Sequence, residues 1–409
     1  MSEISPITNR YLGVMRSAHK TTEVFGIPLI DTDLAPSHAP FGPENGSIHG
    51  FSRRLSELAE DIDDDEPLGG FMKHNIYAAL LAMPVLSGKL RIGHDIEYAD
   101  FVEHTTGIRP EMTPESSDDP AIESLAVQRY GIEEAVARLG FSFRPEDRSA
   151  FHAAYAMDPE STEDTVTSLV EKSKRAVGKI IGNTILQDEG MISVNIGDFG
   201  ASWQAYASAD EHQNLFADIN VNPSFNLSAA EEELIVSHEL AHLASFAIKK
   251  SALANGDLHP AAALVLAFSS MYPQQEVIAR VAEAEVVSAQ GEDPLFQFLA
   301  KHGRYTVDVG VNMMLFANSG ASKEEVEEYG AAHLPFHDPE RIKQQAKDFA
   351  DNLLFKTVFA VDSEVLRIAQ RIAAMPVKEK QSLLQRMCIE PLSPAELRSL
   401  GSVSMPAAG

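Results

Sequence analysis

The strongest constraint on this chain is a five-residue motif, His238-Glu239-Leu240-Ala241-His242, which has the pattern H-E-x-x-H. Residues four apart lie above one another on a helix, so both imidazoles can face one metal ion. Glu239 lies one step further round the helix, where its carboxylate can reach a water molecule on that ion. Zinc hydrolases use this arrangement, with the glutamate as general base. The motif therefore predicts a helix with two metal ligands, His238 and His242, and a catalytic base, Glu239.

The residues around the motif predict a long and largely buried helix over residues 229–250. Ser228 and Glu231 form the S-x-x-E pattern of a capping box, which marks the helix start. Acidic side chains in the first turn, and Lys249 and Lys250 in the last, complement the helix dipole. A metal ion and its water would satisfy the polar groups of the motif. The alternative, two core histidines bonded to carbonyl groups, leaves the adjacent glutamate unexplained.

The composition predicts a soluble globular protein with an acidic surface. Of its 409 residues 44% are hydrophobic and 23% are charged, and the formal net charge is −27. Such a surface repels phosphate backbones, so no nucleic-acid partner is expected. The single cysteine, Cys388, excludes an internal disulfide and fits a reducing compartment. Because residues 1–16 lack a signal-peptide pattern and no apolar stretch could span a bilayer, we expect a cytoplasmic protein without a membrane partner. The oligomeric state is left open.

The remaining pattern is mostly helical, with one short β-rich region in front of the motif. Helical periodicity runs through residues 50–62, 73–86, 122–139, 162–188, 229–250, 260–270, 274–289, 293–318, 323–329, 339–375 and 378–387. Strand-like alternation occupies residues 191–196, 203–207 and 215–221. We therefore predict a mainly α protein with a small antiparallel β-sheet beside the motif helix. The expected parts are a helical lobe over residues 1–165, a catalytic lobe over residues 166–400 and a loose tail over residues 401–409.

The last of these strands is a candidate for substrate binding. The edge of a sheet can hold an extended peptide by main-chain hydrogen bonds. We therefore expect the strand at residues 215–221 to align a small peptide substrate beside the metal. The assigned positions are Leu215, Ala217, Ile219 and Val221. The alternative is a hairpin that only covers the core.

A third metal ligand must lie outside the motif, because a catalytic zinc ion usually has three protein ligands and a water. No histidine occurs in residues 243–257, so the better candidates are acids on the next long helix, namely Glu276, Glu283 and Glu285. Glu276 and Glu283 are seven residues apart and share a helix face. One of them could bind the metal while the other orients a histidine ligand. The alternative for each is an acid that faces solvent.

This order of motifs resembles the thermolysin-type gluzincin metallopeptidases, and the helical pattern is similar to their carboxypeptidase Taq and oligoendopeptidase branch. A closer similarity is to a largely uncharacterised bacterial family of helical metallopeptidases, whose third-ligand helix reads E-G-W-A-L-Y-A-E. Here residues 276–283 read E-V-I-A-R-V-A-E, and residues 304–312 and 320–326 match much of two later segments. The resemblance covers roughly residues 192–369. It implies Glu276 as the third zinc ligand, with Glu283 and Asp308 as supporting or alternative acids.

The chain departs from that family at polar positions. A family histidine aligns with Asn312 and a family tyrosine with Phe355, and such groups commonly stabilise the oxyanion that develops at the scissile carbonyl. Other candidates for this role are Tyr272, His302, Arg304, Tyr305, His333 and His337. Among them we assign catalytic roles to Arg304 and Tyr305. Arg304 could also clamp a substrate carboxylate, and a structural salt bridge explains it equally well.

The expected function is hydrolysis of peptide bonds in short peptides, of carboxypeptidase or oligopeptidase type, with one Zn²⁺ per chain. Zinc lowers the pKa of a water that it binds to about 7, and Glu239 would pass the proton of that water to the leaving amine. One alternative is a metalloenzyme that acts on a non-peptide substrate. Another is a non-catalytic helical protein with a metal site, although a structural site needs no general base. Manganese, cobalt or another divalent ion could replace zinc.

Overall fold

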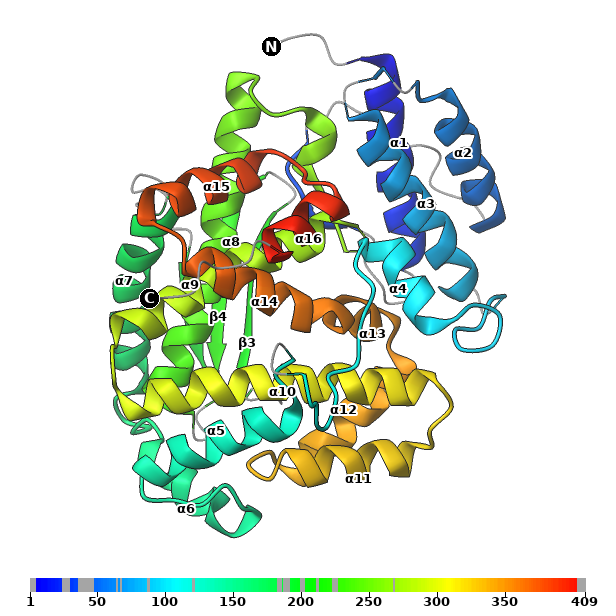
Figure 1. Cartoon of the computed structure of the whole chain (residues 1–409). Coiled ribbons are helices and arrows are strands. Elements are labelled where there is room, and N and C mark those ends of the chain that lie inside the picture. The colour runs from blue at the N-terminus through cyan, green and yellow to red at the C-terminus, as the bar shows by residue number, and fades with distance from the viewer. Residues whose placement is uncertain are drawn as a thin grey trace.

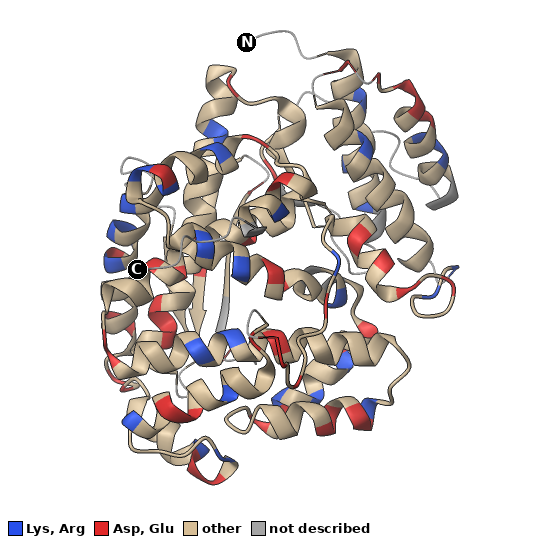
Figure 2. Cartoon of the chain, viewed as in Figure 1, with Lys and Arg blue, Asp and Glu red and all other residues tan. Residues whose placement is uncertain are grey.

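Most of the chain forms helices, as its apolar periodicity predicts (Figure 1). The computed structural model describes residues 5–23, 30–35, 48–63, 65–66, 68–86, 89–119, 122–181, 186, 192–198, 203–210, 213–222, 227–267 and 269–402. Acidic and basic residues are interspersed over these helices (Figure 2). Within the described ranges, no helix has both the length and the apolar character that crossing a bilayer requires.

The first part of the chain contains α1 (Pro6–Glu23), β1 (Ile30–Asp33), α2 (Ile48–Asp61), α3 (Gly69–Leu86), α4 (Tyr98–Thr106), α5 (Leu125–Arg138), α6 (Pro145–Tyr155) and α7 (Thr162–Ile181). The middle part contains β2 (Ile192–Ile196), β3 (Trp203–Ala209), β4 (Leu215–Val221), α8 (Ala229–Asn255), η2 (Pro260–Ala263), β5 (Leu264–Leu266) and α9 (Met271–Ala289). The last part contains α10 (Pro294–Asn318), α11 (Lys323–His333), α12 (Pro339–Asp351), α13 (Leu353–Val358), η3 (Phe359–Val361), α14 (Asp362–Ala373), α15 (Val377–Ile389) and α16 (Pro394–Ser402).

The motif helix α8 packs against α7, α9, α15 and the strands β3 and β4. The predicted capping box is present: Ser228 Oγ accepts from the backbone N–H of Glu231, whose carboxylate accepts from the N–H of Ser228 at 2.8 Å. The helix therefore begins where the sequence predicts. It ends at Asn255 rather than at residue 250, because Gly256, at φ 80°, caps it in the left-handed conformation.

The strands in front of α8 form a mixed sheet in the order β2-β4-β3, so the prediction of an antiparallel sheet is wrong in part. β3 and β4 are antiparallel neighbours joined by a short turn, whereas β2 and β4 are parallel. The reason is strand order. β3 lies at the edge of the sheet opposite β2. β4 follows β3 and lies between the two, parallel to β2 and antiparallel to β3.

β4 is consequently the central strand and offers no free edge to a substrate. Both of its sides are occupied by neighbouring strands. The side chains assigned to substrate binding are in the core: Leu215, Ala217, Ile219 and Val221 are 7%, 0%, 0% and 0% exposed. That assignment is therefore wrong. These residues pack in the core beneath the sheet, and β4 contacts the motif helix α8.

Two of the predicted helices are replaced by several shorter elements in the structure. Residues 260–270 were expected as one helix but include η2 and β5, and β5 pairs with β1 through Ile30 and Leu266. A short and continuously apolar run does not distinguish a buried helix from a buried strand. Residues 339–375 break into α12, α13, η3 and α14, and the first break comes at Asn352, whose ψ is 109°.

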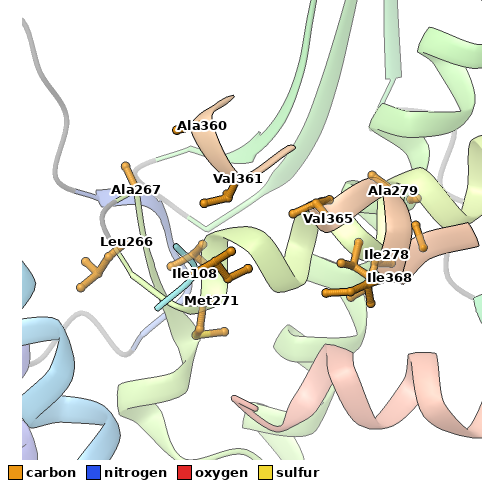
Figure 3. Close-up of a cluster of buried hydrophobic side chains, with 14 of the residues drawn as sticks. Ile108, Leu266, Ala267, Met271, Ile278, Ala279, Ala360, Val361, Val365 and Ile368 are labelled. Atoms are coloured by element: carbon orange, nitrogen blue, oxygen red, sulfur yellow. The ribbon is translucent and has the colours of Figure 1, made fainter. Parts of the chain in front are cut away.

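The helices α1 to α4 pack on one another, and the β1–β5 pair joins this group to the elements around α8 (Figure 1). α5, which belongs to the expected lobe over residues 1–165, packs along α10 of the expected catalytic lobe. α14 packs along α9 through buried apolar side chains that include Ile278, Ala279, Val365 and Ile368 (Figure 3). α9 is thus held between the motif helix and α14.

Candidate metal centre

The packing of α8 against α9 brings His238, His242 and Glu276 together. The Nε2 atoms of the two histidines are 3.1 Å apart. Oε2 of Glu276 lies 3.4 Å from Nε2 of His238, and its Oε1 lies 3.4 Å from Nε2 of His242. One donor atom from each residue lies within 4.8 Å of the other two, and in the described part of the chain no other group of three meets this condition.

These distances fit a tetrahedral metal ion. Bonds of about 2.0–2.1 Å to zinc place neighbouring ligand atoms about 3.3 Å apart. The three side chains are 15%, 12% and 12% exposed, so the centre is sheltered without being sealed. Two imidazoles and one carboxylate make up the ligand set of catalytic sites, which keep a fourth position open. The geometry therefore provides a three-ligand site for a divalent metal ion.

Glu283 holds His238 from the other side of its ring. Nδ1 of His238 bonds to Oε1 of Glu283 at 2.7 Å, which leaves Nε2 facing Glu276. This kind of bond fixes the tautomer and the orientation of a histidine ligand. The two acids that the sequence left open thus lie on opposite sides of His238. The third candidate, Glu285, instead pairs with Lys380.

Opposite charges compensate one another among these side chains. Burial lowers the pKa of His238, but hydrogen bonds to Glu276 and Glu283 outweigh it and raise the pKa to about 10. Burial raises the pKa of Glu276, yet hydrogen bonds to both histidines hold that pKa well below its usual value. Burial also raises the pKa of Glu283, and Arg280 and His238 more than reverse the effect. Both carboxylates therefore stay ionised and attract a cation.

Two charged residues at this centre were missed in the sequence. Arg280 donates to both carboxylate oxygens of Glu283 at 3.0 Å, and Asp362 of α14 lies 3.9 Å from Arg280. Arg280 stands three residues before Glu283, so helical spacing could have revealed the pair. No local signal could have revealed Asp362, because only the packing of α14 against α9 brings it there.

Glu239, the proposed general base, is 6% exposed and follows His238 on α8. The other predicted polar residues have partners away from the metal group: Arg304 pairs with Glu123 at 2.6 Å, Tyr305 bonds to His333 at 2.7 Å, and Asp308 accepts from Gln128 at 2.7 Å. Arg304 thus forms a salt bridge, which is one of the two roles that the sequence suggested for it. Catalytic roles for Arg304 and Tyr305, and a supporting role for Asp308, stay predictions.

The two positions that depart from the related family have different surroundings. Asn312 is buried, and its amide donates to the carbonyl of Thr113 at 2.8 Å and accepts from the N–H of Thr113 at 2.9 Å. It therefore fastens the loop over residues 109–119 to α10. Phe355 is 37% exposed, and its ring is tilted by 45° against that of Phe359, with ring centroids 5.0 Å apart. Neither contact involves the metal group.

Comparisons with known proteins bear on the fold. No family model and no curated protein matches the sequence. The crystal structure of the putative lipoprotein from Colwellia psychrerythraea is similar, with a TM-score of 0.54 and 12% sequence identity over 87% of this chain and 67% of that chain. At this identity the similarity shows the fold alone. The resemblance to gluzincin metallopeptidases stays a prediction, and function has to be argued from the metal centre.

Proposed function

We propose that this protein is a zinc-dependent hydrolase that cleaves peptide bonds in short peptides. The observation that carries the proposal is the spacing of His238, His242 and Glu276: the two Nε2 atoms lie 3.1 Å apart, and each lies 3.4 Å from a different oxygen of Glu276. A glutamate next to the first histidine gives this centre a base that a purely structural site would not need. The choice of peptides as substrates rests on the resemblance of residues 276–326 to helical metallopeptidases.

Each residue of the centre has a role in the proposed reaction. His238, His242 and Glu276 would hold the ion, and Glu283 would keep Nδ1 of His238 protonated and Nε2 available. A bound zinc ion would supply a Lewis acid and lower the pKa of a water molecule to about 7. The Glu239 carboxylate would accept the proton of the attacking water and return it to the leaving amine.

Tyr272 is our choice for the group that stabilises the developing oxyanion. Among the six side chains considered for this role, Tyr272 is the one on a metal-binding helix, in the first turn of α9. It stands four residues before Glu276, so the two side chains share a helix face. A phenol in this position can donate a hydrogen bond to an oxyanion next to the metal.

Metal content and turnover test the proposal. Elemental mass spectrometry should find about one zinc per chain in the wild type and in Glu285→Gln, and none in Glu276→Gln. Glu285 is the matched control, because it lies on the same helix but pairs with Lys380. Glu239→Gln should keep its zinc yet cleave a peptide library about 10²–10⁴-fold more slowly, and Tyr272→Phe should also keep its zinc and slow turnover.

Two results would overturn the proposal. Wild-type protein that holds no metal after zinc is offered would exclude a zinc hydrolase. Zinc-loaded protein that cleaves no member of the library would exclude a peptidase and leave a metal centre with another substrate. A Glu239→Gln variant that turns over at the wild-type rate would exclude Glu239 as the base.

A further inference from the structure

A charged pair interrupts the apolar contact between α9 and α14. Ile278 and Ala279 of α9 meet Val365 and Ile368 of α14 in a buried cluster (Figure 3). Arg280 follows directly on α9, and its side chain is 24% exposed. Its partner across this contact is Asp362, the first residue of α14, whose side chain is 10% exposed. Burying such a pair brings desolvation costs that the attraction between the charges often fails to offset.

The pair continues directly into the metal centre. The Arg280 guanidinium donates to both oxygens of Glu283 at 3.0 Å, and Oε1 of Glu283 bonds to Nδ1 of His238 at 2.7 Å. On its other side Arg280 lies 3.9 Å from Asp362. A single line of contacts therefore runs from α14 through α9 to a metal-ligating histidine of α8.

Charge balance explains why Glu283 needs an arginine. Glu276 and Glu283 flank one imidazole, and Asp362 adds a third carboxyl group nearby. Nη1 of Arg280 donates to both oxygens of Glu283, which fixes this carboxylate beside the His238 ring and offsets its charge.

The arginine also distinguishes this chain from the family that its metal helix resembles. Residues 276–283 read E-V-I-A-R-V-A-E, where the family segment reads E-G-W-A-L-Y-A-E. The two glutamates and both alanines are shared, but Arg280 stands where the family has leucine.

We propose that Arg280, anchored by Asp362, is a positioning residue that holds the Glu283 carboxylate in place and so keeps His238 oriented to bind the metal. The role rests on the proposed metal centre, but the contacts themselves exist without metal. An arginine that only ties α9 to α14 would affect stability and leave the histidine unchanged. The ¹⁵N signals of the His238 ring therefore distinguish a positioning role of Arg280 from a purely structural one.

The test is ¹⁵N NMR of histidine-labelled, metal-free protein, with the His238 signals assigned from His238→Gln. The variants are Arg280→Leu, Arg280→Lys, Asp362→Asn, Glu283→Gln and Arg367→Leu. Arg367 is the matched control, because it forms a similar i,i+3 pair with Glu364 at 3.2 Å on α14. We expect Arg280→Leu to shift the Nδ1 and Nε2 signals of His238 in the same direction as Glu283→Gln. Arg280→Lys should restore part of the shift, Asp362→Asn should cause a smaller one, and Arg367→Leu none.

A zinc titration of the same proteins gives the second measurement. Arg280→Leu should weaken zinc binding about tenfold, the lower end of the range for partners of metal ligands, and Arg367→Leu should not change it. Unchanged His238 signals in Arg280→Leu beside shifted signals in Glu283→Gln would overturn the proposal. If the signals shift as expected but the wild type binds no zinc, Arg280 still positions His238, while the proposed zinc hydrolase is excluded. Failure of the positioning role can therefore be told apart from failure of the proposed function.

Discussion

Replacing Lys249 with methionine should stabilise the fold at neutral pH. Lys249 lies on the metal-binding helix α8 and is 0% exposed, and its Nζ has no hydrogen-bond partner within the described chain. Burial lowers the pKa of its amine from 10.5 to about 8, although the neighbouring Cys388 opposes the change. At pH 7 the folded protein must therefore hold an ammonium group in apolar surroundings.

The size of the effect follows from the two pKa values. One pKa unit corresponds to about 1.4 kcal/mol, so the difference between 10.5 and about 8 amounts to about 3 kcal/mol. Below both values the penalty is present in full. Between about 8 and 10.5 the unfolded chain binds a proton that the folded chain does not, so wild-type stability rises with pH and the penalty disappears.

Urea unfolding of wild type, Lys249→Met and Lys250→Met, at about pH 7 and about pH 10.5, tests this account. Lys250 is the matched control, because it is exposed and donates to the carbonyl of Gln213 at 2.6 Å. Lys249→Met should gain about 3 kcal/mol at pH 7 and almost nothing at the higher pH, and Lys250→Met should stay within about 0.5 kcal/mol. A loss of stability in Lys249→Met at pH 7, or a gain independent of pH, would refute the reasoning.

Three further predictions concern the centre and its surroundings. Glu283→Gln should weaken zinc binding about 10–100-fold in a competition titration while Glu285→Gln does not, and equal affinities would show that the bond to His238 is unimportant. Tyr305→Phe should lower the free energy of unfolding by about 1 kcal/mol through loss of its bond to His333; a loss of turnover in the same variant would support its catalytic assignment, and unchanged turnover would refute it. Gly330→Ala should destabilise by about 1–3 kcal/mol in urea, because its Cβ would lie 2.8 Å from Ile342 and 2.9 Å from Met313, whereas Gly303→Ala, with open space around it, should not.

The two histidines of the centre could be predicted from the sequence because their spacing is local. Helical periodicity places His238 and His242 on one face, and the capping box at Ser228 sets the start of that helix. Glu276 was harder to predict, since only the packing of α9 on α8 brings it to the histidines. The choice between Glu276 and Glu283 needed a resemblance, because seven residues separate them and periodicity gives them the same face.

What could not be predicted depends on contacts between distant segments. The order β2-β4-β3 is set by how the chain crosses the sheet, and alternation within β4 is the same for an edge strand and a central one. Lys249 was expected in the last turn of its helix, but α8 continues to Asn255 and α15 packs against it. Asp362 reaches Arg280 only through the packing of α14 against α9.

The polar groups of α8 separate into two kinds, and the difference supports the proposed centre independently of any family. Near its ends α8 buries Glu232, whose carboxylate oxygens lack hydrogen-bond partners in the described chain, and Lys249, whose amine also lacks one. Burial, with help from Glu231, raises the pKa of Glu232 to about 7 and lowers that of Lys249 to about 8, so both move toward their neutral forms. His238 and His242 instead meet carboxylates on α9, and their donor atoms converge at metal-ligand spacing. Packing in the core alone does not explain why the polar groups in the middle of α8 meet carboxylates while those near its ends lack hydrogen-bond partners in the described chain.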